Sequence, residues 1–119
     1  MNIYKVFVYM FYALDAEYDE NPNEILGDYL SGLNPFLFKE ECSADPAEFE
    51  EFKKSYIKCF GNTEPDCEDV YDFCRDYLEK NAPKEIVQAF SQTKKEDWIF
   101  AFEIKGEIRH VPNCFQRPQ

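Results

Sequence analysis

Carboxylates are the side chains in this 119-residue sequence that could do the most chemistry. The chain has 24 Asp and Glu against 13 Lys and Arg, a net charge of −11, and a single His. Residues 1–83 hold 19 acids and 7 bases, while the rest of the chain is almost balanced. The excess is greatest in residues 15–24, which contain no base, and in residues 64–80, where only Arg75 and Lys80 intervene. A regional excess of this kind favours a basic partner.

Four carboxylates of the second stretch have the spacing of one helical face. They stand at i, i+4, i+8 and i+11, and they are Glu68, Asp72, Asp76 and Glu79. Like charges at this spacing repel by about 0.2–0.5 kcal/mol per pair, and the sequence shows no obvious relief. The column is open to three interpretations: a solvated face that maintains solubility, a surface that meets a basic protein, or a divalent-metal site completed by a second helix.

Two phenylalanines follow the predicted end of a helix, in the segment Asn34-Pro35-Phe36-Leu37-Phe38. On a loop they either fill the core beneath it or stay exposed as anchors for a partner. We expect a partner-binding surface built from these aromatic residues and from both acidic stretches. The predicted partner-binding residues are Glu68, Asp72, Asp76, Glu79, Asp15, Asp19, Glu20, Phe36 and Phe38.

Catalysis is not indicated by the residues that usually perform it. His110 is the only imidazole, and Cys114 follows four residues later, but a Cys/His pair also needs an orienting group and an oxyanion hole. The sequence has neither a Gly-rich phosphate loop nor a nucleophile motif. Paired carboxylates could act as acid and base, but with 24 acids such pairs are expected by chance. We therefore expect no catalytic residues.

The five cysteines are Cys42, Cys59, Cys67, Cys74 and Cys114. An odd number fits a disulfide framework poorly, and a chain of this length does not need one. No C-x-x-C pair is present, and Cys67 and Cys74 are seven residues apart, so a zinc site is not indicated. We expect reduced thiols, no metal and no cofactor, which points to the cytoplasm.

Nucleic acids and membranes are poor candidate partners for so acidic a chain, because both are bound through positive charge. The apolar run from Ile3 to Leu14 has 12 residues. It is shorter than the roughly 20 residues that span a bilayer, and it lacks the small-residue cleavage site of a signal peptide. The run is better interpreted as a buried core element, and its length favours a central helix over a strand.

Helix-start signals recur along the chain. Asn21-Pro22-Asn23-Glu24 and Asp45-Pro46-Ala47-Glu48 combine a capping side chain, a proline and an early glutamate. Looser versions begin at Thr63 and Asn81, and Thr93-Lys94-Lys95-Glu96 has the capping-box pattern. Apolar residues then repeat at intervals of three and four after each start. The pattern predicts one all-α domain over residues 1–119, a compact bundle of five to six helices.

The C-terminal third is less clearly patterned. The capping box favours a helix from Thr93 that ends at Gly106, but alternation of Phe100, Phe102 and Ile104 would also suit a short hairpin over residues 98–110. The segment 111–119 contains two prolines and is expected to be an irregular tail.

Two segments resemble the small acidic immunity proteins of bacteria. They are Leu30-Ser31-Gly32-Leu33-Asn34-Pro35-Phe36-Leu37-Phe38 and Ser43-Ala44-Asp45-Pro46-Ala47-Glu48-Phe49-Glu50-Glu51-Phe52. The resemblance implies an all-α cytoplasmic protein that binds and neutralises a cognate toxin without doing chemistry. We therefore expect a non-catalytic protein that occludes a basic toxin domain. An acidic DNA-mimic or phage-type inhibitor is the first alternative, and a small enzyme or metal-binding protein is the second.

Overall fold

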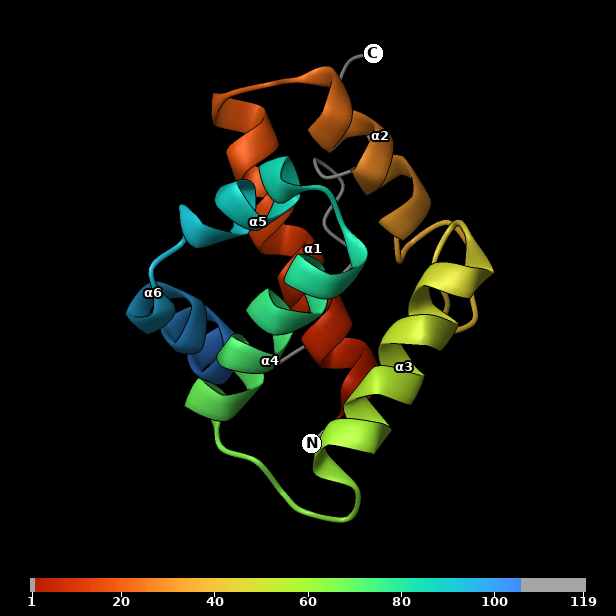
Figure 1. The fold of residues 1–119 in the computed structure, drawn as a ribbon, viewed down its shortest axis with the longest axis vertical. Coiled ribbons are helices and arrows are strands. Elements are labelled where there is room, and N and C mark those ends of the chain that lie inside the picture. Colours follow the sequence, from red (N-terminus) through yellow and green to blue (C-terminus); the bar gives the residue numbers. More distant parts are fainter. Residues whose placement is uncertain (1, 106–119) are drawn as a thin grey trace.

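Helix α1, Ile3–Glu20, runs through the middle of the molecule (Figure 1). It lies there because it is apolar on nearly every side, so neighbouring helices must cover it from several directions. In the computed structural model, which describes residues 2–105, α1 contacts α2, α3 and α5. The expectation of a helix over residues 3–14 is confirmed, and the helix continues through the acidic residues 15–20.

The other elements follow α1 in chain order. They are α2 Glu24–Leu33, α3 Pro46–Phe60, α4 Cys67–Asn81, α5 Lys84–Ser91, α6 Lys95–Phe100 and the π-helical turn η1 Ala101–Lys105. Every regular element within residues 2–105 is helical, which confirms the all-α bundle. Helix α4 lies against α3, α5 and α6, so one of its flanks faces α3 and another faces α6 (Figure 1).

The helices begin close to the positions that the sequence pattern indicates, but only some of them are capped by the expected side chain. Asp45 caps α3 as predicted, and its side chain accepts a hydrogen bond from the Ala47 N–H, with Pro46 as the first helical residue. The Glu48 side chain need not reach back to the cap, because the Asp45 N–H donates to the Gly32 carbonyl at 2.9 Å. Ser43 completes this corner, where its buried hydroxyl accepts a hydrogen bond from the Phe49 N–H at 2.9 Å.

Other caps are shifted from the residues that the pattern indicated. Asn23 rather than Asn21 caps α2, because the Asn21 N–H already closes the end of α1 on the Glu17 carbonyl. Asp66 caps α4, three residues after Thr63. Helix α5 begins after Pro83, without a side-chain cap.

The capping box at Thr93 does not form, and this prediction is wrong. Helix α6 begins at Lys95 without a side-chain cap, and the Thr93 carbonyl accepts a hydrogen bond from the Tyr71 hydroxyl. Residues 98–105 are helical, so the hairpin alternative is also wrong there. The expected helix end at Gly106 and the tail 111–119, together with His110 and Cys114, lie outside the described residues.

Aromatic rings hold the helices together. The Phe52 ring of α3 is fully buried and lies 5.1 Å from Phe7 of α1, 5.4 Å from Phe73 and 5.0 Å from Tyr77 of α4, measured between ring centroids. At the other side of α1, the Trp98 indole N–H donates to the Tyr9 carbonyl at 3.1 Å. These contacts fix where α3 and α6 lie on either side of α4.

Within residues 2–105, no helix is both long and apolar enough to cross a membrane. The four cysteines in this range are free thiols. Cys74 is fully buried, and burial raises its pKa far above the usual range for a thiol. Cys74 therefore acts as a small apolar core residue.

We expect Phe52→Ala to lower the free energy of unfolding by about 3–5 kcal/mol, because the change leaves a cavity between three aromatic neighbours. Urea unfolding followed by circular dichroism measures the loss. Ile57→Ala on the same helix is the matched control, because Ile57 is 51% exposed, and it should change stability by no more than about 0.5 kcal/mol. Equal losses in both variants would contradict the packing described for α3.

Candidate functional site

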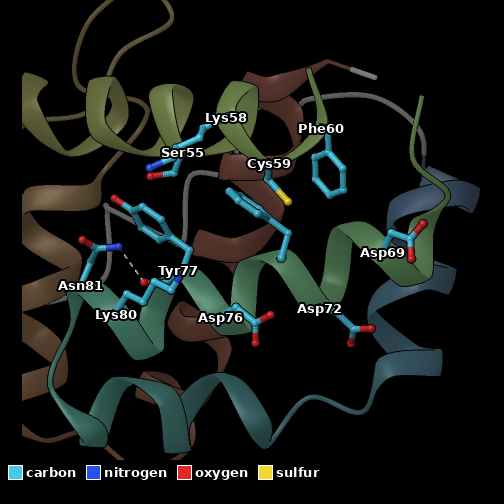
Figure 2. A pocket seen from close by; sticks show the side chains of 11 residues that line it. Ser55, Lys58, Cys59, Phe60, Asp69, Asp72, Asp76, Tyr77, Lys80 and Asn81 are labelled. Carbon is cyan, nitrogen blue, oxygen red and sulfur yellow. Dashed lines mark hydrogen bonds between the residues drawn. The ribbon is translucent and has the colours of Figure 1, made fainter. Parts of the chain in front are cut away.

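An open groove of about 600 Å³ lies between α3 and α4 (Figure 2). Helix α3 contributes one wall and α4 the other. The lining residues are Ser55, Lys58, Cys59, Phe60, Asp69, Asp72, Phe73, Asp76, Tyr77, Lys80 and Asn81. The groove combines aromatic rings with charged side chains of both signs, so it can hold an apolar group and a charged group together.

The aromatic part of the groove continues the hydrophobic core. Phe60 of α3 lies 5.6 Å from Phe73 of α4, and Phe73 lies 6.2 Å from Tyr77. Phe73 and Tyr77 also contact the buried Phe52 ring. The core beneath these rings fixes their positions. The groove is therefore preformed, and binding requires little rearrangement of its side chains.

The charges of the groove are separated along its length. Asp69 lies near the beginning of α4, whereas Lys80 lies near its end, and Lys58 faces that end from α3 (Figure 2). Asp76 is exposed between them, and its carboxylate lies 3.8 Å from the Arg75 Nε atom. The groove thus has an acidic end and a basic end.

Asp72 is held by cations from two directions. Its Oδ1 atom lies 2.9 Å from the Lys95 Nζ atom of α6 and 3.5 Å from an Arg75 nitrogen. The hydrogen bond to Asp72 raises the pKa of Lys95 above its usual value. The sequence shows no obvious local relief of the repulsion in the column, and the relief at Asp72 comes from Lys95, on a helix whose position the sequence pattern does not reveal.

The structure places the predicted acidic residues in separate regions. Glu68, Asp76 and Glu79 are exposed on α4, and Asp72 is half-buried beside α6. Asp15 is only 5% exposed and does not contribute to an acidic surface. Asp19 and Glu20 are exposed at the end of α1, which lies at the top of Figure 1, away from the beginning of α4.

The two predicted aromatic anchors have different environments. Phe36 is half-buried, and its ring lies 6.1 Å from Phe11 and 5.9 Å from Tyr12, so it fills the core beneath the loop. Phe38 is exposed next to the more exposed Leu37. Only Phe38 of the pair is available as an anchor.

The α3 side of the groove was missed by sequence reasoning. Lys58, Cys59 and Phe60 gain their role only because α3 lies beside α4. The α4 side carried a signal that was available: Asp69, Phe73, Asp76 and Lys80 stand at i, i+4, i+7 and i+11 and share one face.

Two observations on the described part of the chain concern metal ligands and thiols. No three His, Cys, Asp or Glu side chains within residues 2–105 are grouped so that they could hold a metal ion. The Cys67 thiol donates to Glu103, and burial together with this carboxylate raises its pKa. A raised thiol pKa lowers the fraction of nucleophilic thiolate.

Comparisons of the chain with protein-family models, with curated proteins and with solved structures found no match. Function is therefore inferred from the charge and geometry of the groove and of the acidic face of α4.

We expect Asp72→Asn to destabilise the protein, because it leaves Lys95 without its carboxylate. The Lys95 pKa is raised by this contact, so the contribution is complete below the ordinary lysine value of about 10.4 and is lost as the pH rises above it. Urea midpoints of Asp72→Asn and the parent protein should differ at pH 7, and the difference should begin to shrink only once the pH exceeds the ordinary lysine value.

Asp76→Asn is the matched control, because its carboxylate is 61% exposed and has only a 3.8 Å contact with Arg75. This variant should leave the urea midpoint unchanged or raise it slightly, since it removes repulsion along α4. If Asp72→Asn behaved like Asp76→Asn at pH 7, the ion pair with Lys95 would contribute nothing to stability.

Proposed function

We propose that this protein is a non-catalytic cytoplasmic immunity protein that binds and occludes a basic toxin domain. The observation that carries the proposal is the acidic face of α4 beside a groove with aromatic walls. Interfaces commonly combine an apolar centre with a polar rim, and aromatic residues dominate their binding energy. The resemblance of residues 30–38 and 43–52 to acidic immunity proteins agrees with this interpretation.

The net charge of −11 supports a two-step binding mechanism. Opposite fields first accelerate the encounter and orient the basic partner toward α4. Phe60, the groove ring that is still partly exposed, then buries apolar area once the partner reaches the groove. In this mechanism the charges govern the association rate, and the groove governs how long the complex lasts.

Occlusion explains how binding alone neutralises a toxin. A nuclease binds the phosphates of its substrate through Lys and Arg. Carboxylates of α4 that pair with those side chains would exclude the nucleic acid from them. A nuclease is therefore the toxin class that fits the charge of this surface best.

A coding sequence directly upstream that specifies a toxin-like C-terminal domain would provide the partner for a direct test. Co-expression with this protein should restore growth to cells that the domain kills, and equimolar protein should inhibit the purified domain. Failure of the two proteins to bind would reject this pairing, and binding without inhibition would reject occlusion.

We expect association with the toxin domain to slow as salt rises, because exposed charges are screened over about 8 Å at physiological ionic strength. The triple variant Glu68→Gln, Asp76→Asn and Glu79→Gln should lower the association rate by about tenfold at low salt while changing the dissociation rate much less. It retains Asp72 and hence the contact with Lys95. Stopped-flow mixing at two salt concentrations measures both effects.

The control removes charge from the end of α1 instead, in the double variant Asp19→Asn and Glu20→Gln. It should slow association less than the triple variant, because these residues lie away from the groove. If the control slowed association more, the interface would lie near α1 and the exposed Phe38 rather than on α4.

A further inference from the structure

Cys59 differs from the other cysteines within residues 2–105, because its thiol is exposed and makes no hydrogen bond there. The Cys42 and Cys67 thiols each donate a hydrogen bond, and both side chains are partly buried. Cys74 is fully buried. Thiol–disulfide exchange requires access to the sulfur, so Cys59 is the cysteine of this range that is best placed for it.

The Cys59 sulfur points into the groove between α3 and α4 (Figure 2). A group joined to this sulfur would therefore lie in the groove. The groove volume of about 600 Å³ falls within the range of ligand pockets, roughly 300–1,000 Å³. A small thiol joined to Cys59 thus has room there.

A buried hydroxyl in the same groove independently points to a ligand. Tyr77 is only 4% exposed, and it lines the groove with its hydroxyl directed toward α3 (Figure 2). This hydroxyl has no hydrogen-bond partner within residues 2–105, although buried polar groups normally have one. Burial, together with the carboxylates of Glu48 and Glu51, raises the pKa of Tyr77. The hydroxyl therefore keeps its proton and can donate to an acceptor.

The chemistry of this end of the groove defines the ligand. Lys58 of α3 and Lys80 of α4 line it, and neither forms an ion pair within residues 2–105, so both can hold carboxylates. The acceptor at Tyr77 is better supplied by a neutral amide carbonyl, because the nearby glutamates would repel a further negative charge. A ligand with carboxylates, peptide bonds and a thiol satisfies all of these groups.

We propose that Cys59 is a thiolation site, where a small acidic peptide thiol is joined through a mixed disulfide and lies along the groove toward Lys58, Lys80 and Tyr77. The Cys59 thiol loses its proton, and the thiolate attacks one sulfur of a peptide disulfide. A bond forms between Cys59 and that sulfur while the original S–S bond breaks. The second peptide leaves as a thiolate, which takes up a proton, so the peptide disulfide is the oxidant.

The test treats the full chain with glutathione disulfide and locates the adduct by peptide mapping with mass spectrometry. Cys59 should be modified before Cys42 and Cys67. The double variant Lys58→Gln and Lys80→Gln should slow this reaction about two- to fivefold and leave the reaction with uncharged hydroxyethyl disulfide unchanged. Both lysines are exposed, so the variant is expected to fold.

Lys53→Gln with Lys54→Gln is the matched control, because it removes the same charge from exposed positions of α3 that do not line the groove. It should slow the reaction with glutathione disulfide less than the groove variant does. Tyr77→Phe tests the hydroxyl separately. It should lower the equilibrium constant of adduct formation about threefold without lowering the stability of the unmodified protein, because the hydroxyl has no partner there.

Four results would overturn the assignment: modification of Cys42 or Cys67 ahead of Cys59, equal slowing in the two lysine variants, the same slowing with hydroxyethyl disulfide, or an adduct as stable in Tyr77→Phe as in the parent protein. None of these measurements needs a toxin.

The effect of the adduct on toxin binding is the one part that rests on the proposed function. The adduct would cover the groove, so the modified protein should bind the toxin domain more weakly than the reduced protein. Unchanged affinity would place the interface outside the groove and leave the thiolation site standing. Modification of Cys59 in a protein that inhibits no toxin domain would reject the proposed function alone.

Discussion

The need to bury α1 on almost every side is the constraint on which the rest of the structure depends. Ten of its residues, including Phe7, Phe11 and Leu14, are buried. A helix that is apolar all round is stable in water only when other helices surround it. Helices α2, α3 and α5 contact it directly, and α4 closes the bundle over α3 and α5. Their polar faces must then point outward, which explains why so acidic a chain still has a large aromatic core.

The same aromatic core determines which way the carboxylates of α4 point. Helix α4 inserts Phe73 and Tyr77 beside the Phe52 ring, and this turns its carboxylates toward solvent and toward the groove. The contact of Lys95 with Asp72 then ties α6 to the outer side of α4. Packing and electrostatics are therefore coupled in α4, because one helix supplies core rings, an internal ion pair and the acidic end of the groove.

The groove has less area than a complete protein interface. The charged surface around the groove would have to supply the remaining contact area. A standard interface buries about 800 Å² on each partner, which a single groove cannot supply. The exposed acids of α4 would form the rim around it and determine the rate and orientation of approach. Phe60, which is partly exposed in the groove, would provide an apolar contact at the centre of that rim.

Local sequence signals determined the helices, and only the tertiary structure decided how their side chains combine. The cap at Asp45 and the periodicity of α4 could be predicted because both depend on residues within one or two turns of each other. The pairing of Asp72 with Lys95, the burial of Asp15 and the placing of Lys58 and Asp69 along one groove could not, because each depends on helices that are distant in sequence. The Thr93 capping box failed for the same reason: α6 begins two residues later, and the Tyr71 hydroxyl of α4 donates to the Thr93 carbonyl. Short-range chemistry acts within a segment, whereas the packing of an aromatic core decides which segments meet.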